Sequence, residues 1–391
     1  MLSSAHKRII QETVPLLETH GQTLTQHFYT LLFTEHPEVQ VFFNQTHQSS
    51  GQQARALANS ILQYARHIDE HETLKPMLER IANKHVALNV APEHYPTVGN
   101  CLLKAIEEVL GSNVATRDVL TAWQAAYAEL AELLIFSENN LYQRSAQAPG
   151  GWRNLRTFNV AALRQESDSI RSLTLAPADG GPVLDYRAGQ YVGLRMMIDG
   201  QDVQRTYSLS KRSDNRTLQL SVKRRANGLA SSYLHSRRPG DVLHVFPPAG
   251  EFVLDEGHQP VVLLTAGVGI TPAIPLLEEA LARGRLVHFV HATQNSSTFA
   301  FAALVRSHAA CHREYMSLRL CYSRPLPDDV ADATGRLNAQ QLREWLPEIT
   351  TAQAYLVGPI GFMADMKAAL LQLGLPETQL RYECFGPHAA L

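Results

Sequence analysis

Cysteine is scarce in this sequence, and no two cysteines stand close enough to form a short metal-binding or redox motif. The 391 residues contain only Cys101, Cys311, Cys321 and Cys384. Small secreted domains depend on clustered cysteines for disulfides, whereas cytosolic proteins keep their few thiols reduced. The scattered cysteines therefore exclude a disulfide scaffold and favour a cytoplasmic protein.

One-sided charge and long apolar runs are also missing. There are 35 Lys and Arg against 37 Asp and Glu, which gives a formal net charge of -2 at pH 7. A dedicated nucleic-acid surface would be basic, so no nucleic-acid partner is expected. No apolar stretch approaches the ~18–20 residues that cross a bilayer, and the N-terminus lacks the apolar core of a signal peptide. We therefore expect a monomer without an integral membrane segment.

The pattern changes twice along the chain and predicts three domains. Residues 1–146 carry apolar residues at three- and four-residue spacings, as in Val119–Leu134, which predicts six to eight helices. After the Pro and Gly near residue 150, β-rich runs such as FNVAALRQ and RTYSLSK predict an antiparallel β-barrel over 151–256. Over 258–391, strands such as VVLLTA alternate with helices, which predicts a parallel α/β domain.

The α/β region opens with TAGVGITP, Thr265–Pro272, between an apolar strand and a helix. Gly267 and Gly269 let the backbone turn tightly and approach a phosphate, while the helix presents free N–H groups to it. An ordinary strand-to-helix turn fits this motif equally well by itself. Pro272 replaces the third glycine, and no acidic residue ends the next strand, so the usual dinucleotide fingerprint is incomplete.

The barrel region contains RTYS, Arg205–Ser208, a short way after GQY at Gly189–Tyr191. Arg can hold a pyrophosphate through two N–H groups, Tyr can stack on a flavin, and Ser can donate to a ring nitrogen. Together with TAGVGITP, YLVGPIGFM and the terminal YECFGP, this motif resembles the ferredoxin–NADP reductase superfamily over about residues 151–391. That resemblance implies a flavin barrel followed by a nicotinamide domain.

The same resemblance implies which residues hold the two cofactors. Those expected to hold FAD are Tyr191, Arg205, Thr206, Tyr207 and Ser208, with backbone N–H groups of Gly228 to Ser231 on its phosphates. Those expected to frame NAD(P)H are Gly267, Val268, Gly269, Ile270, Thr271 and Pro272, with Cys384, Phe385, Gly386 and Pro387. The sequence leaves open the choice between NADH and NADPH.

Seventeen histidines are present, and context singles out His85. It lies in IANKHVALNV, a helical segment with an apolar face that is followed by Pro92. In a helical domain of this length, the segment resembles the proximal-histidine region of a globin, and neutral imidazole is a good axial ligand for haem iron. Taken alone, the pattern also permits a solvated histidine or one bonded to a backbone carbonyl.

Four neighbours extend the resemblance to a whole family. Tyr29 lies in HFYTLLF, Phe43 in VFFNQ, and Gln53 and Leu57 are one helical turn apart in GQQARALANS. With His85, this set resembles the bacterial flavohaemoglobins, also known as nitric oxide dioxygenases, and the match covers essentially the whole chain. It implies that Phe43 wedges the porphyrin of a haem b, and that the other three residues line the side where oxygen binds.

The family resemblance also implies groups behind the axial ligand. Tyr95 in PEHYPTVG and Glu138 in FSENNLY fall where the family places a Tyr–Glu pair that draws the Nδ1 proton of His85. The ENN sequence departs from the two-acid pattern expected at this place. Lys84 and Glu383 match family positions thought to influence electron transfer.

The implied activity is oxidation of nitric oxide. NAD(P)H would reduce FAD, FAD would reduce the haem, and haem-bound O₂ would convert NO to nitrate, so that O₂ and NO are the small-molecule partners. Two alternatives stay open: an oxygen sensor or store, and a haem-independent reductase of ferric chelates, quinones or peroxides.

Overall fold

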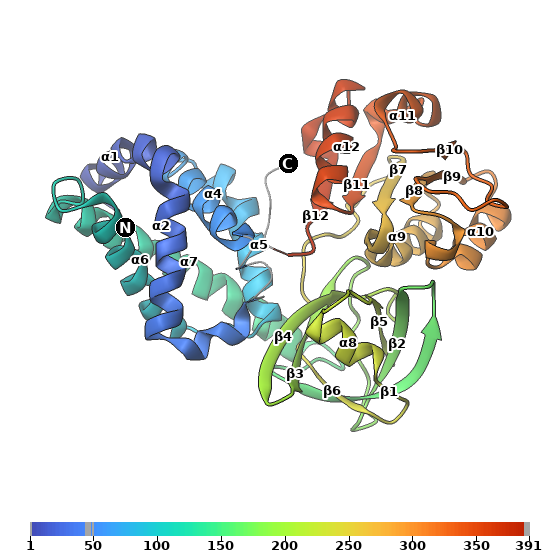
Figure 1. Cartoon of the computed structure of the whole chain (residues 1–391), viewed down its shortest axis with the longest axis horizontal. Helices are drawn as coiled ribbons and strands as arrows, with labels where there is room; N and C mark the ends of the chain where they lie inside the picture. The colour runs from blue at the N-terminus through green and yellow to red at the C-terminus, as the bar shows by residue number, and fades with distance from the viewer. Residues whose placement is uncertain (1, 44–47, 49–50, 387–391) are drawn as a thin grey trace. The chain divides into compact units, whose positions relative to one another are not determined.

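The computed structural model describes residues 2–43, 48 and 51–386 (Figure 1). The predicted NAD(P)H residue Pro387 lies outside the described residues. The chain divides into two compact units, one formed mainly by residues up to 146 and the other mainly by residues 147–385.

The first unit is all-helical. Its helices are α1 (Ser4–Glu12), α2 (Val14–Glu35), the 3₁₀ helix η1 (Pro37–Phe42), α4 (Gln52–Arg66), α5 (His71–Ala87), α6 (His94–Leu110) and α7 (Arg117–Gln147). Leu24, Phe28 and Leu32 of α2 recur every four residues and are nearly completely buried. The Thr25 hydroxyl donates to the carbonyl of Ala54 at 2.8 Å and so fastens α2 to α4.

Helix α7 contains the apolar stretch Val119–Leu134 and extends to Gln147, as the helical prediction for residues 1–146 implies. Glu138 and Tyr142 are buried on its last turns. Among the described residues it is also the one helix long and apolar enough, by length and composition, to cross a membrane. This finding differs from the expectation that no apolar stretch approaches the length of a membrane span. Ala122, Trp123 and Ala126 pack into the core of the first unit, but only 28% of the apolar window is buried, and one helix of this kind is weak evidence for a membrane span.

The second unit begins with an antiparallel sheet of six strands in the order β4-β3-β6-β1-β2-β5. The strands are β1 (Arg156–Gln165), β2 (Ile170–Pro177), β3 (Tyr191–Ile198), β4 (Gln201–Ser208), β5 (Leu218–Lys223) and β6 (Val242–Val245), with helix α8 (Leu229–His235) between β5 and β6. Strand β4 starts earlier than the predicted RTYSLSK strand, since Asp199 and Gly200 both adopt positive φ and turn β3 tightly into β4.

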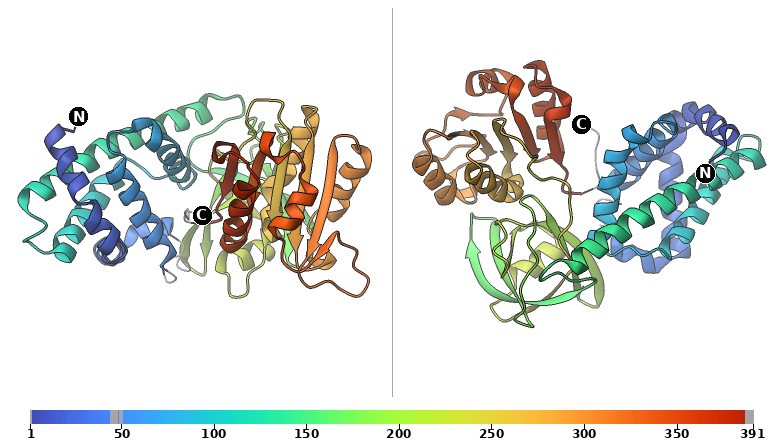
Figure 2. Two further views of the ribbon diagram at one scale, coloured as in Figure 1. Left: turned by 90° about the horizontal axis from the view of Figure 1, so that it is seen from above. Right: turned by 180° about the vertical axis from the view of Figure 1, so that it is seen from behind.

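A parallel sheet with helices on both sides completes the second unit (Figure 2). Its order is β10-β9-β8-β7-β11-β12. The strands are β7 (Val261–Ala266), β8 (Val287–Thr293), β9 (Met316–Tyr322), β10 (Ala333–Thr334), β11 (Gln353–Val357) and β12 (Leu380–Glu383), and the helices are α9 (Ile270–Ala282), α10 (Ala302–Cys311), α11 (Ala339–Trp345) and α12 (Ile360–Gln372). The sequence pattern identified four of these strands and missed the edge strands β10 and β12. The order of connection reverses between β7 and β11, which is where open α/β sheets bind their ligands.

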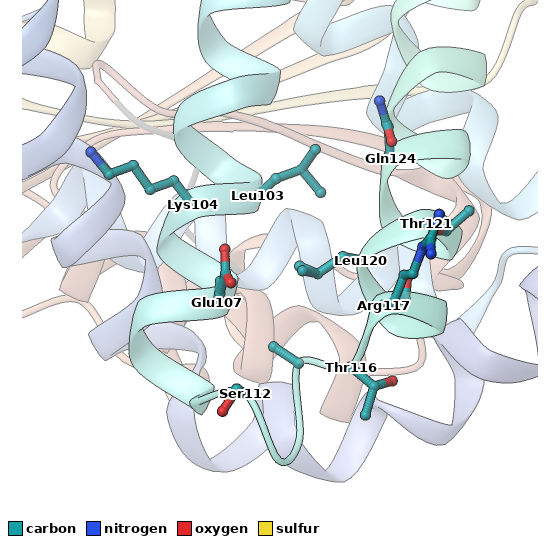
Figure 3. Close-up of a pocket in the computed structure, with 10 residues that line it drawn as sticks. Leu103, Lys104, Glu107, Ser112, Thr116, Arg117, Leu120, Thr121 and Gln124 are labelled. Atoms are coloured by element: carbon teal, nitrogen blue, oxygen red, sulfur yellow. The ribbon is translucent and has the colours of Figure 1, made fainter.

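A cavity of about 520 Å³ lies where α6 ends and α7 begins (Figure 3). Leu103 and Leu120 give it an apolar wall, and Lys104, Glu107 and Arg117 contribute charged groups. None of the predicted site residues lines it.

Candidate functional site

The backbone of His85 is fixed by the way helix α5 ends. Asn89 adopts φ 55°, a left-handed conformation that asparagine tolerates better than most residues. Its N–H donates to the carbonyl of Val86 at 3.1 Å, and the N–H of Val90 donates to the carbonyl of His85 at 2.9 Å. This pair of bonds is a Schellman motif, and it holds the last turn of α5, with His85, in one conformation.

Three helices bring His85, Tyr95 and Glu138 together. The Glu138 Oε1 atom lies 2.7 Å from His85 Nδ1, and the Tyr95 hydroxyl donates to the same oxygen at 2.5 Å. His85 Nδ1 also lies 3.0 Å from the Tyr95 hydroxyl. With Nδ1–H directed at the carboxylate, the lone pair of the imidazole is at Nε2, as a metal-ligating histidine requires.

Burial strengthens this arrangement. Glu138 is 2% exposed, so its carboxylate depends on its two donors for solvation. Burial, and then the hydrogen bond to Glu138, raise the pKa of Tyr95 above the ordinary range of a phenol. Tyr95 therefore remains a neutral donor, and it supports the carboxylate without adding charge.

Tyr127 belongs to the site and was missed by the sequence analysis. Its hydroxyl donates to the carbonyl of Tyr95 at 2.7 Å. The ring lies so close to α6 that a Cβ atom on Gly99 would be 2.5 Å from its Cε1 atom. A glycine in the middle of a helix is costly, and Gly99 was the one signal in the sequence that a side chain packs there.

Tyr29 lies in a separate aromatic cluster of the same unit. Its ring packs against Phe28, Phe33 and Phe43, with ring centroids 4.9–5.6 Å apart. Burial raises the pKa of Tyr29, and a hydrogen bond with the Gln53 side chain lowers it by less. The hydroxyl therefore stays protonated and can donate. Leu57 packs against the same core.

These residues fit a haem. An imidazole whose Nδ1–H is held by a buried carboxylate is the donor set of a strong axial ligand, and Tyr29 and Gln53 form a second pair of hydrogen-bonding side chains in the same unit. Lys84 precedes His85 in α5 and is half-buried. In the second unit, Glu383 ends β12 and is buried.

The predicted flavin residues lie on β3 and β4, the two strands at one edge of the barrel sheet. Arg205, Thr206, Tyr207 and Ser208 form the half-buried end of β4. Tyr191 begins β3 and is 3% exposed; a Cβ atom on Gly250 would be 2.7 Å from its ring, so Gly250 makes room for it.

The segment predicted for the flavin phosphates starts at Gly228, the residue before α8, and continues through the first turn of that helix to Ser231. The Ser231 hydroxyl accepts from the N–H of Arg225 at 3.2 Å and donates to the carbonyl of Gly228 at 3.1 Å. Asn227, with φ 59°, reverses the chain just before Gly228. The turn thus presents main-chain groups from a fixed backbone, which suits a phosphate.

The Gly-rich turn lies at the reversal point of the parallel sheet. Gly267 has φ 54°, and no atom lies within 4 Å of the position where its Cβ would be. A Cβ on Gly269 would be 2.2 Å from the carbonyl oxygen of Val357, so the turn after β7 touches the end of β11. Val268, Ile270, Thr271 and Pro272 continue from this turn into the first turn of α9, where the Thr271 hydroxyl donates to the carbonyl of Val268 at 3.0 Å. A dinucleotide can therefore approach bare backbone here.

The second segment predicted for NAD(P)H follows β12, on the other side of β11. Cys384 is buried, whereas Phe385 is 38% exposed and Gly386 has φ 145°. Cys384 and Phe385 therefore lie beyond the carboxyl end of β12 and the Gly-rich turn beyond that of β7, two parallel strands separated by β11.

Comparisons with known families match all three regions of the chain. Residues 26–134 match the globin family, residues 157–254 the oxidoreductase FAD-binding domain, and residues 263–368 the oxidoreductase NAD-binding domain.

Curated relatives match over the full length. A flavohemoprotein of Pseudomonas aeruginosa is 51% identical and that of Deinococcus radiodurans is 44% identical, with 98–100% of each chain covered. A solved flavohemoglobin of Malassezia yamatoensis, with bound FAD and heme, is 27% identical with a TM-score of 0.87, covering 98% of this chain and 100% of that one. The FAD/NAD-binding domain of a nitric oxide dioxygenase from Vibrio cholerae is 37% identical with a TM-score of 0.56, and covers 60% of this chain and 100% of that one.

Proposed function

This chain belongs to the flavohaemoprotein family, and from that premise we propose that it is a nitric oxide dioxygenase. As a member of the family it is an NAD(P)H-dependent oxidoreductase with a globin domain for haem, a barrel for FAD and an α/β domain for the nicotinamide cofactor. The proposal adds the substrates: O₂ and NO enter, and nitrate leaves.

The reaction balances on electrons. Forming nitrate from NO and O₂ takes one electron, and NADH gives two, so NADH, two NO and two O₂ yield NAD⁺, H⁺ and two nitrate ions. When bound, the nicotinamide supplies hydride, the flavin divides it into single electrons, and the haem iron holds oxygen. The protein has to bind these groups, orient them and stabilise the charge that forms on oxygen.

The proximal residues would make the axial ligand electron-rich. Glu138 draws the Nδ1 proton of His85, which raises the basicity of Nε2 and favours electron density on the iron side. Tyr95 shares the carboxylate, and Tyr127 holds Tyr95 in place.

Tyr29 would donate a hydrogen bond to the oxygen that gains negative charge. Its raised pKa keeps the hydroxyl protonated, and Gln53 would orient that hydroxyl. The phenyl rings around Tyr29 exclude water, and Leu57 would limit the space to small diatomic molecules.

In the reductase half, backbone groups would do most of the binding. The Gly267–Pro272 turn would hold the pyrophosphate of NAD(P)H at the start of α9, and Arg205 and the Gly228–Ser231 turn would hold the phosphates of FAD. Tyr207 and Ser208 would face the flavin ring.

The observation that carries the proposal is the buried His85–Glu138–Tyr95 set, in a chain that also contains a flavin reductase. An oxygen store needs no reductase, and a reductase of soluble acceptors needs no axial ligand of raised basicity. The name of the Vibrio cholerae relative of the reductase half supports the same reading.

Consumption of NO by the purified protein with haem and FAD bound tests the proposal. With NADH and air, we expect rapid NO loss that stops without oxygen and is abolished in His85→Ala, whereas NADH-driven reduction of a soluble dye persists in that variant. Equal NO loss with and without haem would instead support a haem-independent reductase.

We place this reaction in the cytoplasm, where NAD(P)H is available. All four cysteines lie within the described residues and none forms a disulfide, as a reducing compartment requires.

A further inference from the structure

A second group of metal-ligating side chains lies in the globin unit, where α2 ends against α6. It consists of Glu35, the last residue of α2, His36, which follows it, and Cys101 of α6. One carboxylate oxygen, one ring nitrogen and the Sγ atom all lie within 4.8 Å of one another. None of the three belongs to the haem or nucleotide residues described above.

We propose that Glu35, His36 and Cys101 bind a divalent transition metal of the zinc type and thereby tie the end of α2 to α6. Thiolate, imidazole and carboxylate are the three ligand classes that zinc uses, and three protein ligands leave the fourth tetrahedral position to water. Ligand atoms ~2.0–2.3 Å from a tetrahedral centre are about 3.5 Å apart. The ligand atoms would have to move about 1 Å closer together to reach this spacing. The half-exposed Glu35 and His36 side chains can make that movement.

The surroundings of His36 provide an independent indication. Its Nδ1 atom lies 3.3 Å from Oε1 of Glu38, on the following 3₁₀ helix. A histidine that binds a metal usually donates its other ring N–H to a carboxylate, which fixes the tautomer and the ring orientation. With its Nδ1–H donated to Glu38, His36 would bind the metal through Nε2.

The charge at this place also favours a cation. The ammonium group of Lys104, one turn beyond Cys101 on α6, donates to Glu35 Oε1 at 2.5 Å. A metal ion would take over the role of this ammonium group, and Lys104, which is 45% exposed, can turn into solvent.

Cys101 makes the site selective. Its Sγ atom is the one sulfur ligand of the group, and the residue is only 2% exposed. A metal that prefers sulfur would bind as Cys101 releases its thiol proton, whereas Mg²⁺ and Ca²⁺, which prefer oxygen, would not.

Zinc binding to the protein with haem and FAD bound tests the proposal. Equilibrium dialysis against Zn²⁺ should give one zinc per chain, and X-ray absorption at the zinc edge should show one sulfur at about 2.3 Å. We expect Cys101→Ser to remove the sulfur signal and to weaken zinc binding at least about tenfold. Loss of a residue that only hydrogen-bonds to a metal ligand already weakens binding by about that factor. Lys104→Gln should strengthen binding, because it removes the competing ammonium group. Cys311→Ser, which changes an exposed cysteine on α10, is the matched control and should bind like wild type.

Either of two results would contradict the proposed zinc site. One is no stoichiometric zinc at 100-fold excess of the ion over protein; the other is a sulfur signal that survives in Cys101→Ser and disappears in Cys311→Ser. Should Cys101→Ser fail to fold, His36→Gln decides, since His36 lies at the surface. Wild-type zinc affinity in that variant would exclude the proposed ligand set, and a loss of at least about tenfold would support it.

Discussion

The two halves of this protein differ in the groups that form their sites: side chains in the globin unit and main chain in the reductase unit. In the globin unit the proposed chemistry rests on single side-chain groups from separate helices: Nδ1 of His85, the carboxylate of Glu138 and the hydroxyl of Tyr29. In the reductase unit it rests on main chain that side chains leave uncovered, above all at Gly267 and Gly269. Deleting one atom should therefore disable the first kind of site without unfolding it, and adding one atom should obstruct the second.

The largest expected effect comes from the axial ligand. His85→Ala removes the imidazole and leaves the buried carboxylate of Glu138 with one donor, so we expect loss of haem, with FAD retained. Absorption spectra of the purified variant measure both cofactors. His27→Ala is a matched control, since His27 is a histidine of the same unit that pairs with Glu108 at the surface. Normal haem content in His85→Ala would remove His85 from the site.

Adding one carbon to the Gly-rich turn is the corresponding test of the second unit. In Gly269→Ala the new Cβ would meet the carbonyl of Val357 at 2.2 Å, so the turn must move away from β11. Overpacking of this kind costs about 1–3 kcal/mol, and we expect the KM for NADH to rise about tenfold or more. Steady-state kinetics with a soluble dye measures it. Gly361→Ala, where no atom lies within 4 Å of the added Cβ, should leave KM unchanged. Equal values in both variants would contradict the role of Gly269.

Removing the hydroxyl of Tyr29 tests the role of a single side-chain group in the globin unit. Tyr29→Phe keeps the ring and its contacts, so haem content and folding should barely change. A hydrogen bond to a charged acceptor is worth about 1.5–3 kcal/mol, and each ~1.4 kcal/mol is a factor of ten. We therefore expect oxygen to dissociate about 10 to 100 times faster in stopped-flow measurements. A rate equal to that of wild type would show that Tyr29 serves only the aromatic core.

The smallest effect should come from Tyr127. Tyr127→Phe deletes the hydrogen bond to the carbonyl of Tyr95, worth about 1 kcal/mol, and leaves the packing against Gly99 intact. If Tyr127 positions Tyr95, the iron–histidine stretching frequency should shift with little change in melting temperature. A lower melting temperature with an unchanged frequency would assign Tyr127 to stability alone.

The contrast between the halves also explains how far the sequence alone could predict the structure. The order of an all-α domain, an antiparallel barrel and an α/β domain is confirmed by the sheet topology and the family matches, because helical and strand periodicities differ sharply. The Gly-rich turn is contiguous, so one stretch of sequence displays it. Tyr127 acts through tertiary contact with α6, 28 residues away from Gly99, and local sequence patterns carry no such information.

The errors at element boundaries have physical causes as well. Edge strands β10 and β12 are short and only partly buried, so their apolar pattern is weak. Helix α7 continues through SENNLYQRSAQ, where Glu138 and Tyr142 are buried although the run is mostly polar. The carboxylate of Glu138 can be buried because His85 and Tyr95 hydrogen-bond to it, and hydropathy does not indicate such a contact.

The origin of the oxygen atoms in the product tests the central claim most directly. The protein with haem and FAD bound is given NADH, NO and ¹⁸O₂ in unlabelled water, and the nitrate is analysed by mass spectrometry. A nitric oxide dioxygenase must deliver both atoms of one O₂ molecule, so we predict nitrate with two ¹⁸O atoms and two nitrate ions for each NADH consumed. Nitrite or unlabelled nitrate as the main product, or no dependence of NO loss on NADH, would contradict the account.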